Sequence, residues 1–330
     1  MNMAFLLRKL AYRSRIAAYR ARFALGLDRS LHRNRPGGRI LIYHGIDTLG
    51  STEFNSRFIS QDCFRQHMAY FSEHCHVIPL DRYFAGERAP DRLTIALTFD
   101  DGYRNNLELA LPVLEEFNVP ATVFVTAIGA LGKDYLWPDW VDLGTALIQS
   151  PLEFGGRTYR KNRHGQFASD QGTLNQWLIN QPCPQTTGLH DVLPSEEIRS
   201  KPELAPYWRL MDPDDLRHLA DSPLITIGAH SLTHASFTAM GREQARDEMR
   251  RSKLWLEETT GQPVTALAFP FGHYFRETLG DAHDLGYHHL LAVDLAFAED
   301  YSDDRIQARF GINPYIGWDL QLAAILRGSY

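Results

Sequence analysis

The sequence predicts an α/β protein built on parallel strands, and three observations support this fold class. Strand-like apolar runs alternate with helix-like segments after residue 38, as expected when each helix returns the chain to the next parallel strand. Seven such runs are present, too many for half of a dinucleotide-binding fold. The chain has 330 residues, of which 44% are hydrophobic, enough for a full core without disulfides. The predicted strands are residues 39–46, 93–100, 121–126, 224–230, 266–271, 289–294 and 305–312.

Two of the predicted helices have clear boundaries. Residues 103–117 form a helix-like segment that begins after Gly102. Residues 241–261 have a charged helical pattern and end on a glycine, which is the common residue at a helix C-terminus.

Residues 127–211, which we call the insert, interrupt this alternation. They are too long for an ordinary strand-to-helix connection and are rich in Gly, Gln, Pro and aromatic residues. Short helices are predicted at residues 136–148 and around Trp177. Insertions in barrel enzymes often overhang the active-site mouth, so the insert is interpreted as a cap.

The first 38 residues are predicted to form a basic amphipathic arm on an acidic domain, residues 39–330. Residues 1–39 carry ten Lys and Arg against one acid, a charge of +9, whereas the remaining 24 basic and 39 acidic residues give −15. An apolar stripe bordered by arginines suits either contact with an anionic membrane surface through residues 1–30 or docking on the acidic body. The acidic body argues against binding to nucleic acid. The stripe consists of Phe5, Tyr12, Ile16, Tyr19 and Phe23.

The sequence favours a cytoplasmic location, with peripheral contact at the inner face of the membrane. The longest apolar stretch of the arm, residues 3–7, is too short for a secretory signal or a membrane span. Three cysteines without C-x-x-C spacing favour a reducing compartment.

Polar residues at the ends of the predicted strands are the candidates for chemistry, because α/β enzymes place catalytic groups there. Asp100 and Asp101 end the second strand, and adjacent carboxylates repel each other unless a positive charge lies beside them. His230 and His234, at the end of the fourth strand, are one helical turn apart, so both imidazoles can bind one ion.

With Asp101 as third ligand, these residues predict a catalytic metal site with open positions. Asp100 then stays free as the base. A divalent ion lowers the pKa of bound water from about 15.7 to roughly 7, so a carboxylate can generate hydroxide near neutral pH.

These motifs resemble those of the polysaccharide deacetylase family, also called the NodB-homology domain or carbohydrate esterase family 4. "TFDDGY" (98–103) is similar to its first motif, "HSLTH" (230–234) to its second, and "LAFPFG" (267–272) to a variant of its third. The similarity extends from about residue 39 to residue 313, with the insert as an interruption.

The resemblance implies a distorted (β/α)7 barrel that removes N-acetyl groups from amino sugars of a polysaccharide or lipid-linked glycan. It also implies a divalent metal ion, most commonly Zn²⁺. Asp101, His230 and His234 would be the ligands, Asp100 the base, and the backbone N–H of Tyr103 a donor to the oxyanion.

Two positions depart from the family pattern. Ala268 stands where many members have an arginine that orients the base, and Arg309 is a candidate replacement. No histidine follows His289, although many members take their general acid from a C-terminal histidine. His44, at the end of the first strand, is the preferred acid, as in members that act on the exopolysaccharide poly-N-acetylglucosamine; His288 and His289 are alternatives.

Aromatic residues near the motifs are candidates for a sugar-binding wall, although they could equally belong to the core. Alternative functions are deformylation, O-deacetylation of a related glycan, or carbohydrate binding by a barrel that has lost catalysis. The candidate substrate-binding residues are Phe271, Gly272, Tyr274, Trp137, Trp140 and Arg309.

Overall fold

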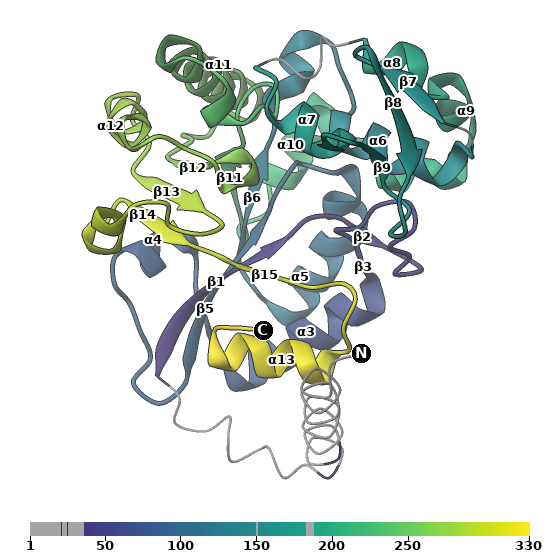
Figure 1. Cartoon of the computed structure of the whole chain (residues 1–330). Coiled ribbons are helices and arrows are strands. Elements are labelled where there is room, and N and C mark those ends of the chain that lie inside the picture. Colours follow the sequence, from purple (N-terminus) through teal and green to yellow (C-terminus); the bar gives the residue numbers. More distant parts are fainter. Residues whose placement is uncertain (1–20, 22–24, 26–35, 150, 183–187) are drawn as a thin grey trace, which may run out of the picture.

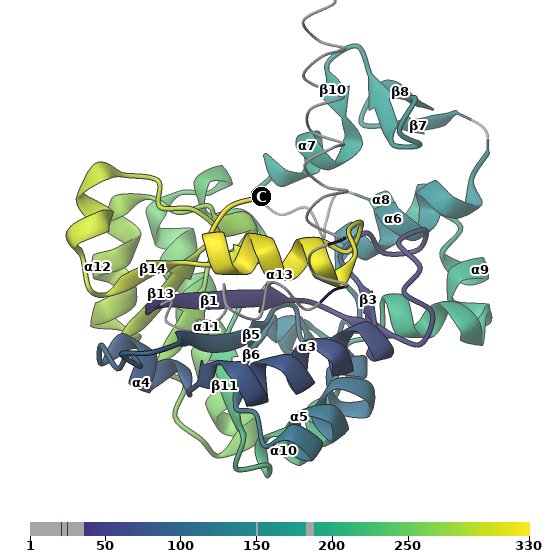
Figure 2. The same ribbon diagram turned by 90° about the horizontal axis from the view of Figure 1, so that it is seen from below.

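The computed structural model describes residues 21, 25, 36–149, 151–182 and 188–330, and its core is a parallel sheet that nearly closes into a barrel (Figure 1). Helices surround the sheet (Figures 1 and 2). A short strand, β4 (His76–Val77), pairs with β5 (Leu93–Phe99) outside the main path. The strands follow the order β14 (Ile306–Ala308), β13 (His289–Ala292), β12 (Ala266–Ala268), β11 (Ile225–Ala229), β6 (Ala121–Val125), β5 (Leu93–Phe99), β1 (Gly37–Tyr43) and β15 (Phe310–Gly311).

This arrangement confirms the predicted distorted (β/α)7 barrel. The first six predicted strands each have a counterpart in the sheet, and neighbouring strands pair in parallel. The seventh, residues 305–312, is divided between the two edges of the sheet. Its first half, β14, pairs with β13, and its second half, β15, pairs with β1. Arg309 lies between the two halves, so one short segment joins both edges of the barrel.

Strand β5 explains why an apolar run leads to the acidic pair. All seven of its residues, Leu93–Phe99, are buried, because β1 and β6 pair with it on either side and helices cover the outer face. The chain leaves the sheet at Asp100, which places both carboxylates at the carboxyl end of the barrel.

The predicted helix at residues 103–117 is present but changes pitch along its length. A π-helical turn, η1 (Asn106–Ala110), leads into α5 (Leu111–Phe117). Pro112 has no N–H to donate to the carbonyl of Glu108, which accounts for the irregular turn before it. The predicted helix at residues 241–261 is α11 (Arg242–Thr260), ended by Gly261 at a φ of 69°.

The other elements around the barrel are short. Strands β2 (Ile46–Asp47) and β3 (Ile59–Ser60) pair with each other beside it. The remaining helices are α3 (Gln61–His74), α4 (Leu80–Phe84), α10 (Pro213–Ala220), η5 (Phe237–Ala239), η6 (Pro270–Gly272), α12 (Arg276–Asp284), η7 (Ala298–Ser302) and α13 (Trp318–Arg327).

The insert forms a separate layer with its own hydrophobic cluster, which also includes Phe58 and Tyr103 (Figure 2). Both predicted helical regions are present, as α6 (Trp137–Leu147) and α7 (Leu174–Ile179). An antiparallel sheet between them was not predicted. It comprises β7 (Leu152–Phe154), β8 (Arg157–Lys161), β9 (Phe167–Ser169) and β10 (Gly172–Thr173). The other helices in the described part of the insert are η2 (Ala127–Leu131), α8 (Leu189–Val192), α9 (Ser195–Ser200) and η4 (Pro202–Tyr207).

The predicted amphipathic arm, residues 1–38, lies outside the described residues apart from Ala21, Leu25 and residues 36–38. Among the residues that the structure describes, no helix combines the length and apolar character needed to cross a membrane.

Replacing Gly102 with alanine should lower the free energy of unfolding more than replacing a glycine that is required only for its left-handed backbone conformation. Its φ is +86°, and an added Cβ would lie 2.9 Å from Val125 Cγ1 and 3.3 Å from Val125 Cα. Gly86 has a φ of +84° with nothing within 4 Å, so Gly86→Ala isolates the backbone cost, about 1–2 kcal/mol. We expect Gly102→Ala to lose about 1–3 kcal/mol more through overpacking. Urea unfolding of both variants checks this; equal losses would contradict it.

Candidate active site

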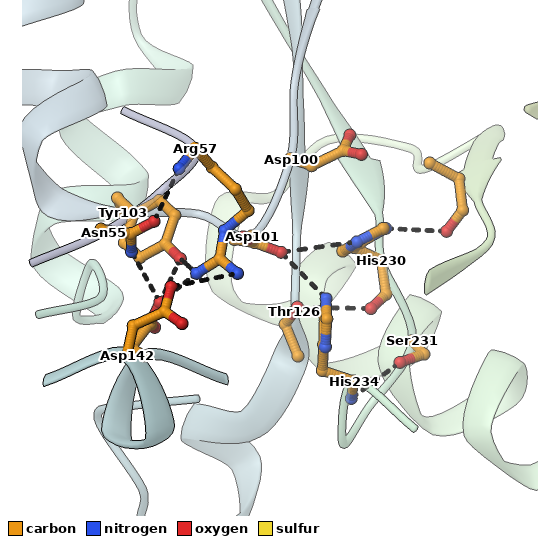
Figure 3. Close-up of polar contacts among 12 residues, drawn as sticks. Asn55, Arg57, Asp100, Asp101, Tyr103, Thr126, Asp142, His230, Ser231 and His234 are labelled. Atoms are coloured by element: carbon orange, nitrogen blue, oxygen red, sulfur yellow. Dashed lines mark hydrogen bonds and ion pairs between the residues drawn. The ribbon is translucent and has the colours of Figure 1, made fainter. Parts of the chain in front are cut away.

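The loops after β5 and β11 bring one carboxylate and two imidazoles together (Figure 3). The Asp101 Oδ1 atom lies 3.5 Å from His230 Nε2 and 3.0 Å from His234 Nε2. All three side chains are buried. The three residues that the sequence analysis selected as ligands therefore converge on one point.

Their geometry and chemistry fit a divalent cation. Tetrahedral zinc with bonds of about 2 Å separates its ligand atoms by roughly 3.3 Å, close to both observed distances. Asp101 Oδ1 is buried and accepts no hydrogen bond from any residue that the structure describes, as expected of an atom that serves a cation. The His230 ring hydrogen-bonds through Nδ1 to the Ala268 carbonyl at 2.9 Å, which directs Nε2 toward Asp101.

The protonation states also suit metal binding. Burial lowers the pKa of His230 to about 4, so its imidazole is neutral at physiological pH, as a ligand must be. Burial would raise the pKa of Asp101, but the nearby His234 ring holds it well below its usual value.

The segment that carries the two histidines is a loop, so the expected helical turn is wrong. Ser231 and His234 have left-handed φ values of 63° and 56°. The buried Glu248 on α11 fixes this loop by accepting hydrogen bonds from the Leu232 and Thr233 N–H groups, both at 2.9 Å, and from the Thr233 hydroxyl at 2.7 Å. The imidazoles converge because of these contacts and not through helical spacing.

The end of β6 connects the two ligand loops. The Thr126 N–H donates to the Asp101 carbonyl at 3.2 Å, and the Ala127 N–H donates to the Ser231 carbonyl at 3.0 Å. The described chain has five non-glycine residues with positive φ, and Asp101, Ser231, His234 and Phe271 are four of them. Such conformations cost about 1–3 kcal/mol each and concentrate at functional sites.

The Asp100 carboxylate is held in place by Arg309. The guanidinium donates two hydrogen bonds to the Asp100 carboxylate, at 2.6 and 2.7 Å, and both side chains are buried. Burial would raise the pKa of Asp100, but Arg309 and His230 together hold it below its usual value. Arg309, counted above among the substrate-binding candidates, therefore contacts the candidate base directly.

His44 follows β1 and is half-buried at the same end of the barrel. Its pKa is lowered from the ordinary value, mainly by burial, while the charges of Asp101 and Asp100 oppose this shift. His289, by contrast, begins β13 at the opposite end of the barrel, where it packs against Phe84.

The Tyr103 N–H takes no part in the backbone bridge that holds its segment. Tyr103 faces Leu210 in an isolated antiparallel bridge. Its neighbours carry the hydrogen bonds of this bridge, from Arg104 N–H to Arg209 and from Met211 N–H to Gly102. In such a pair the N–H of the central residue points away from the facing segment.

Arg57 is a site residue that the sequence analysis missed. Its guanidinium lies between Asp101 and the insert, with Nε 4.0 Å from Asp101 Oδ2 and Nη2 2.5 Å from Asp139 Oδ1 (Figure 3). The Tyr103 hydroxyl also donates to Asp139, at 2.6 Å. Arg57 lies in a loop without a recognisable motif, so only its contacts identify it.

The aromatic candidates separate into two groups. Phe271 packs on the His234 ring, with centroids 4.8 Å apart, and the buried Trp137 lies behind it. Trp140 donates its indole N–H to Ser195 within the insert, and Tyr274 donates to Asp300. Both side chains are buried, so these two residues belong to the core and not to a sugar-binding wall. Gly272 has a φ of +73°, and an added Cβ would meet the Val293 backbone at 2.7 Å.

The two carboxylates and two imidazoles lie at the carboxyl ends of the strands, which is where (β/α)-barrel enzymes place their functional groups. Comparison with known proteins identifies the family. Residues 87–290 match the family model described as polysaccharide deacetylase, and the chain belongs to that family. YxkH of Bacillus subtilis (strain 168), which carries the same family name, is 21% identical over 252 residues, 75% of this chain and 61% of YxkH.

Solved structures share the fold at low sequence identity. IcaB from Ammonifex degensii matches 88% of this chain and 97% of its own, with a TM-score of 0.55 and 16% identity. The Streptococcus pyogenes deacetylase PplD, in complex with acetate, matches 87% of this chain and 97% of its own, with a TM-score of 0.52 and 17% identity.

Replacing Arg309 should destabilise the protein in a pH-dependent manner. Arg309→Gln leaves the Asp100 carboxylate buried without a partner, which should cost roughly 3–5 kcal/mol at neutral pH. In the wild type, the lowered pKa of Asp100 gives stability that is present above the unfolded-state pKa of about 3.9 and is lost as the pH falls through the folded-state value. In the variant, uncompensated burial raises that pKa.

The difference in unfolding free energy between the two proteins should therefore shrink as the pH falls toward about 4. Urea unfolding in chelator at several pH values measures it. Arg305→Gln is the control, since Arg305 pairs with Asp303 but keeps its guanidinium partly in solvent, and such a pair costs less to break than a buried one. A difference independent of pH would contradict the assignment.

Glu248 should control metal affinity without contacting the metal. Glu248→Gln leaves a single acceptor oxygen for three donors of the histidine loop, so zinc affinity should fall by about tenfold or more. Glu243→Gln, on the exposed face of the same helix, is the matched control. Zinc titration against a competing chelator measures both; equal affinities would rule out this role for Glu248.

Proposed function

We propose that this protein is a metal-dependent hydrolase that removes N-acetyl groups from the amino sugars of a polysaccharide or lipid-linked glycan. The observation that carries the proposal is the Asp101, His230 and His234 cluster with Asp100 held beside it by Arg309. Membership of the polysaccharide deacetylase family supports the reaction class.

A divalent cation, most suitably Zn²⁺, held by Asp101, His230 and His234 would supply Lewis acidity to the acyl carbonyl and acidify a water molecule. Asp100 accepts the proton of that water as its oxygen attacks the carbonyl carbon. Arg309 keeps Asp100 ionised and fixes its orientation. The Tyr103 N–H donates to the oxyanion that develops.

The C–N bond then breaks, and the amine nitrogen takes a proton from His44, so the products are acetate and the free amino sugar. Phe271, packed on the His234 ring, forms an apolar wall for the acyl group or the sugar. Arg57 and Asp139 link this centre to the insert, which makes the insert a candidate for substrate selection.

The basic arm would bring the enzyme to an anionic membrane surface at the cytoplasmic face. Such contact would suit a lipid-linked substrate better than a released polysaccharide.

The same site could serve a deformylase or an O-deacetylase, since both reactions use an acidified water and a base. A purely carbohydrate-binding barrel is less favoured, because binding does not require a buried carboxylate held ionised beside the metal ligands.

Acetate release from chitooligosaccharides tests the proposal. We expect chelator to abolish the activity and zinc to restore it. Asp100→Asn should lower kcat by about 100- to 10,000-fold, the range of general base catalysis, and should retain zinc. Asp281→Asn is a matched control, since Asp281 is also buried and held by arginines, on α12.

Other products would redirect the proposal. Formate release from N-formyl sugars alone would identify a deformylase, and cleavage of acetyl esters alone an O-deacetylase. Zinc binding without hydrolysis of any acylated sugar would favour the alternative of a carbohydrate-binding barrel that has lost catalysis.

A further inference from the structure

The guanidinium of Arg57 lies where the candidate metal site meets the insert. Its Nε atom is 4.0 Å from Asp101 Oδ2, its Nη2 atom 2.5 Å from Asp139 Oδ1, and its Nη1 atom 4.0 Å from Asp142 Oδ2. Figure 3 shows Arg57 between Asp101 and Asp142. Burial would lower the pKa of Arg57, but Tyr103 and the three carboxylates hold it well above its usual value. The group is therefore a permanent positive charge beside a candidate metal ligand.

The two oxygens of the Asp101 carboxylate face different partners. Oδ1 is 3.5 Å from His230 Nε2 and 3.0 Å from His234 Nε2, on the side where the ion would lie. Oδ2 faces Arg57 Nε at 4.0 Å, which is an ion pair but too long for a hydrogen bond. Carboxylates bind metal ions through one oxygen or through two. A cation that attracts Oδ2 therefore favours binding through Oδ1 alone.

The Nε–H of Arg57 is the one part of this guanidinium fork that is not already held. Arg57 Nη2 donates to Asp139 and, at 3.1 Å, to the Tyr103 hydroxyl. Arg57 Nε is buried and has no hydrogen-bond partner in the described part of the chain, although buried polar groups are nearly always paired. A shift of roughly 1 Å would bring it within hydrogen-bonding distance of Asp101 Oδ2.

The charge of Arg57 also opposes an ion at this site. A cation bound by Asp101 Oδ1 would share that carboxylate with the guanidinium, and like charges repel at such short range. Asp139 and Asp142 lie on the insert side of Arg57, away from the imidazoles (Figure 3). Arg57 thus acts in the opposite sense to Glu248, whose contacts support the ligand loop.

We propose that Arg57 is a positioning residue for Asp101. It holds Oδ2 away from the ion, so that coordination positions stay open as a catalytic site requires, and it lowers the affinity of the site for its ion. The inference rests on the metal site of the proposed function, but not on the sugar or the acyl group.

Zinc titration against a competing chelator tests the proposal. Arg57→Gln should raise zinc affinity by about tenfold or more, the scale on which residues around metal ligands act. Arg57→Lys keeps the charge and should bind zinc with nearly the wild-type affinity. A fall or no change in Arg57→Gln, or an equal rise in Arg57→Lys, would overturn the proposal.

Asn55→Ala is the matched control for the structural role of this loop. The Asn55 side chain donates to Asp139 at 2.9 Å and accepts from the Arg57 backbone N–H at 3.2 Å, so its loss loosens the same contact with the insert but leaves the guanidinium in place. Zinc affinity in Asn55→Ala should stay the same or fall. A rise as large as that of Arg57→Gln would show that loosening the loop, and not the lost charge, is responsible.

A measurement on the wild type keeps the proposal testable if Arg57→Gln does not fold. The NMR signal of the Arg57 Nε–H, assigned by its loss in Arg57→Lys, should shift when zinc binds. The Arg242 Nε–H, which donates to Asp281 on α12 at 2.6 Å, should not shift. Zinc binding without a change at Arg57 would overturn the positioning role and leave the proposed function intact, whereas a wild type that binds no zinc would overturn both.

Discussion

The ion pair between Arg309 and Asp100 is the interaction on which the site and the closure of the barrel both depend. Arg309 lies between β14 and β15, where the seventh strand passes from one edge of the sheet to the other. Its guanidinium reaches into the barrel and meets a carboxylate at the end of β5 through two hydrogen bonds. Breaking a buried pair by removing one partner is costly because the remaining charge stays desolvated. The fold therefore holds the candidate base ionised and in place.

The metal-ligand cluster depends on a different kind of support. Its two loops contain residues in left-handed backbone conformations, which an isolated peptide would seldom adopt. Backbone hydrogen bonds from Thr126 and Ala127, together with the Glu248 carboxylate, hold these loops in place. The ligands are thus positioned by a strand end and a helix that contribute no ligand themselves, as expected of a site preorganised for its ion.

The sequence pattern predicted the parallel strands well because they are buried on both faces and appear as continuous apolar runs, whereas the barrel was expected from the family resemblance. It also predicted the ligand cluster, since strand ends of a parallel sheet share one edge. The prediction failed where contacts between residues far apart in the chain determine the local structure. The spacing of His230 and His234 indicated a helical turn, but the loop conformation comes from Glu248. The inserted sheet was missed, although Gly155 and Gly156, both with positive φ, join β7 to β8 in a tight hairpin. Arg57 had no local signal, because its role arises from contacts with Asp101 and Asp139, far away in the chain.

The division of the seventh strand has a consequence for biosynthesis. During translation the polypeptide emerges from its amino end, and domains begin to fold before synthesis is complete. Asp100, Asp101 and both histidines leave the ribosome well before Arg309. A nascent chain can therefore gather its candidate metal ligands while its barrel is still open and its candidate base lacks a counterion. The candidate site would be complete only late in synthesis, when the closing segment docks between β13 and β1.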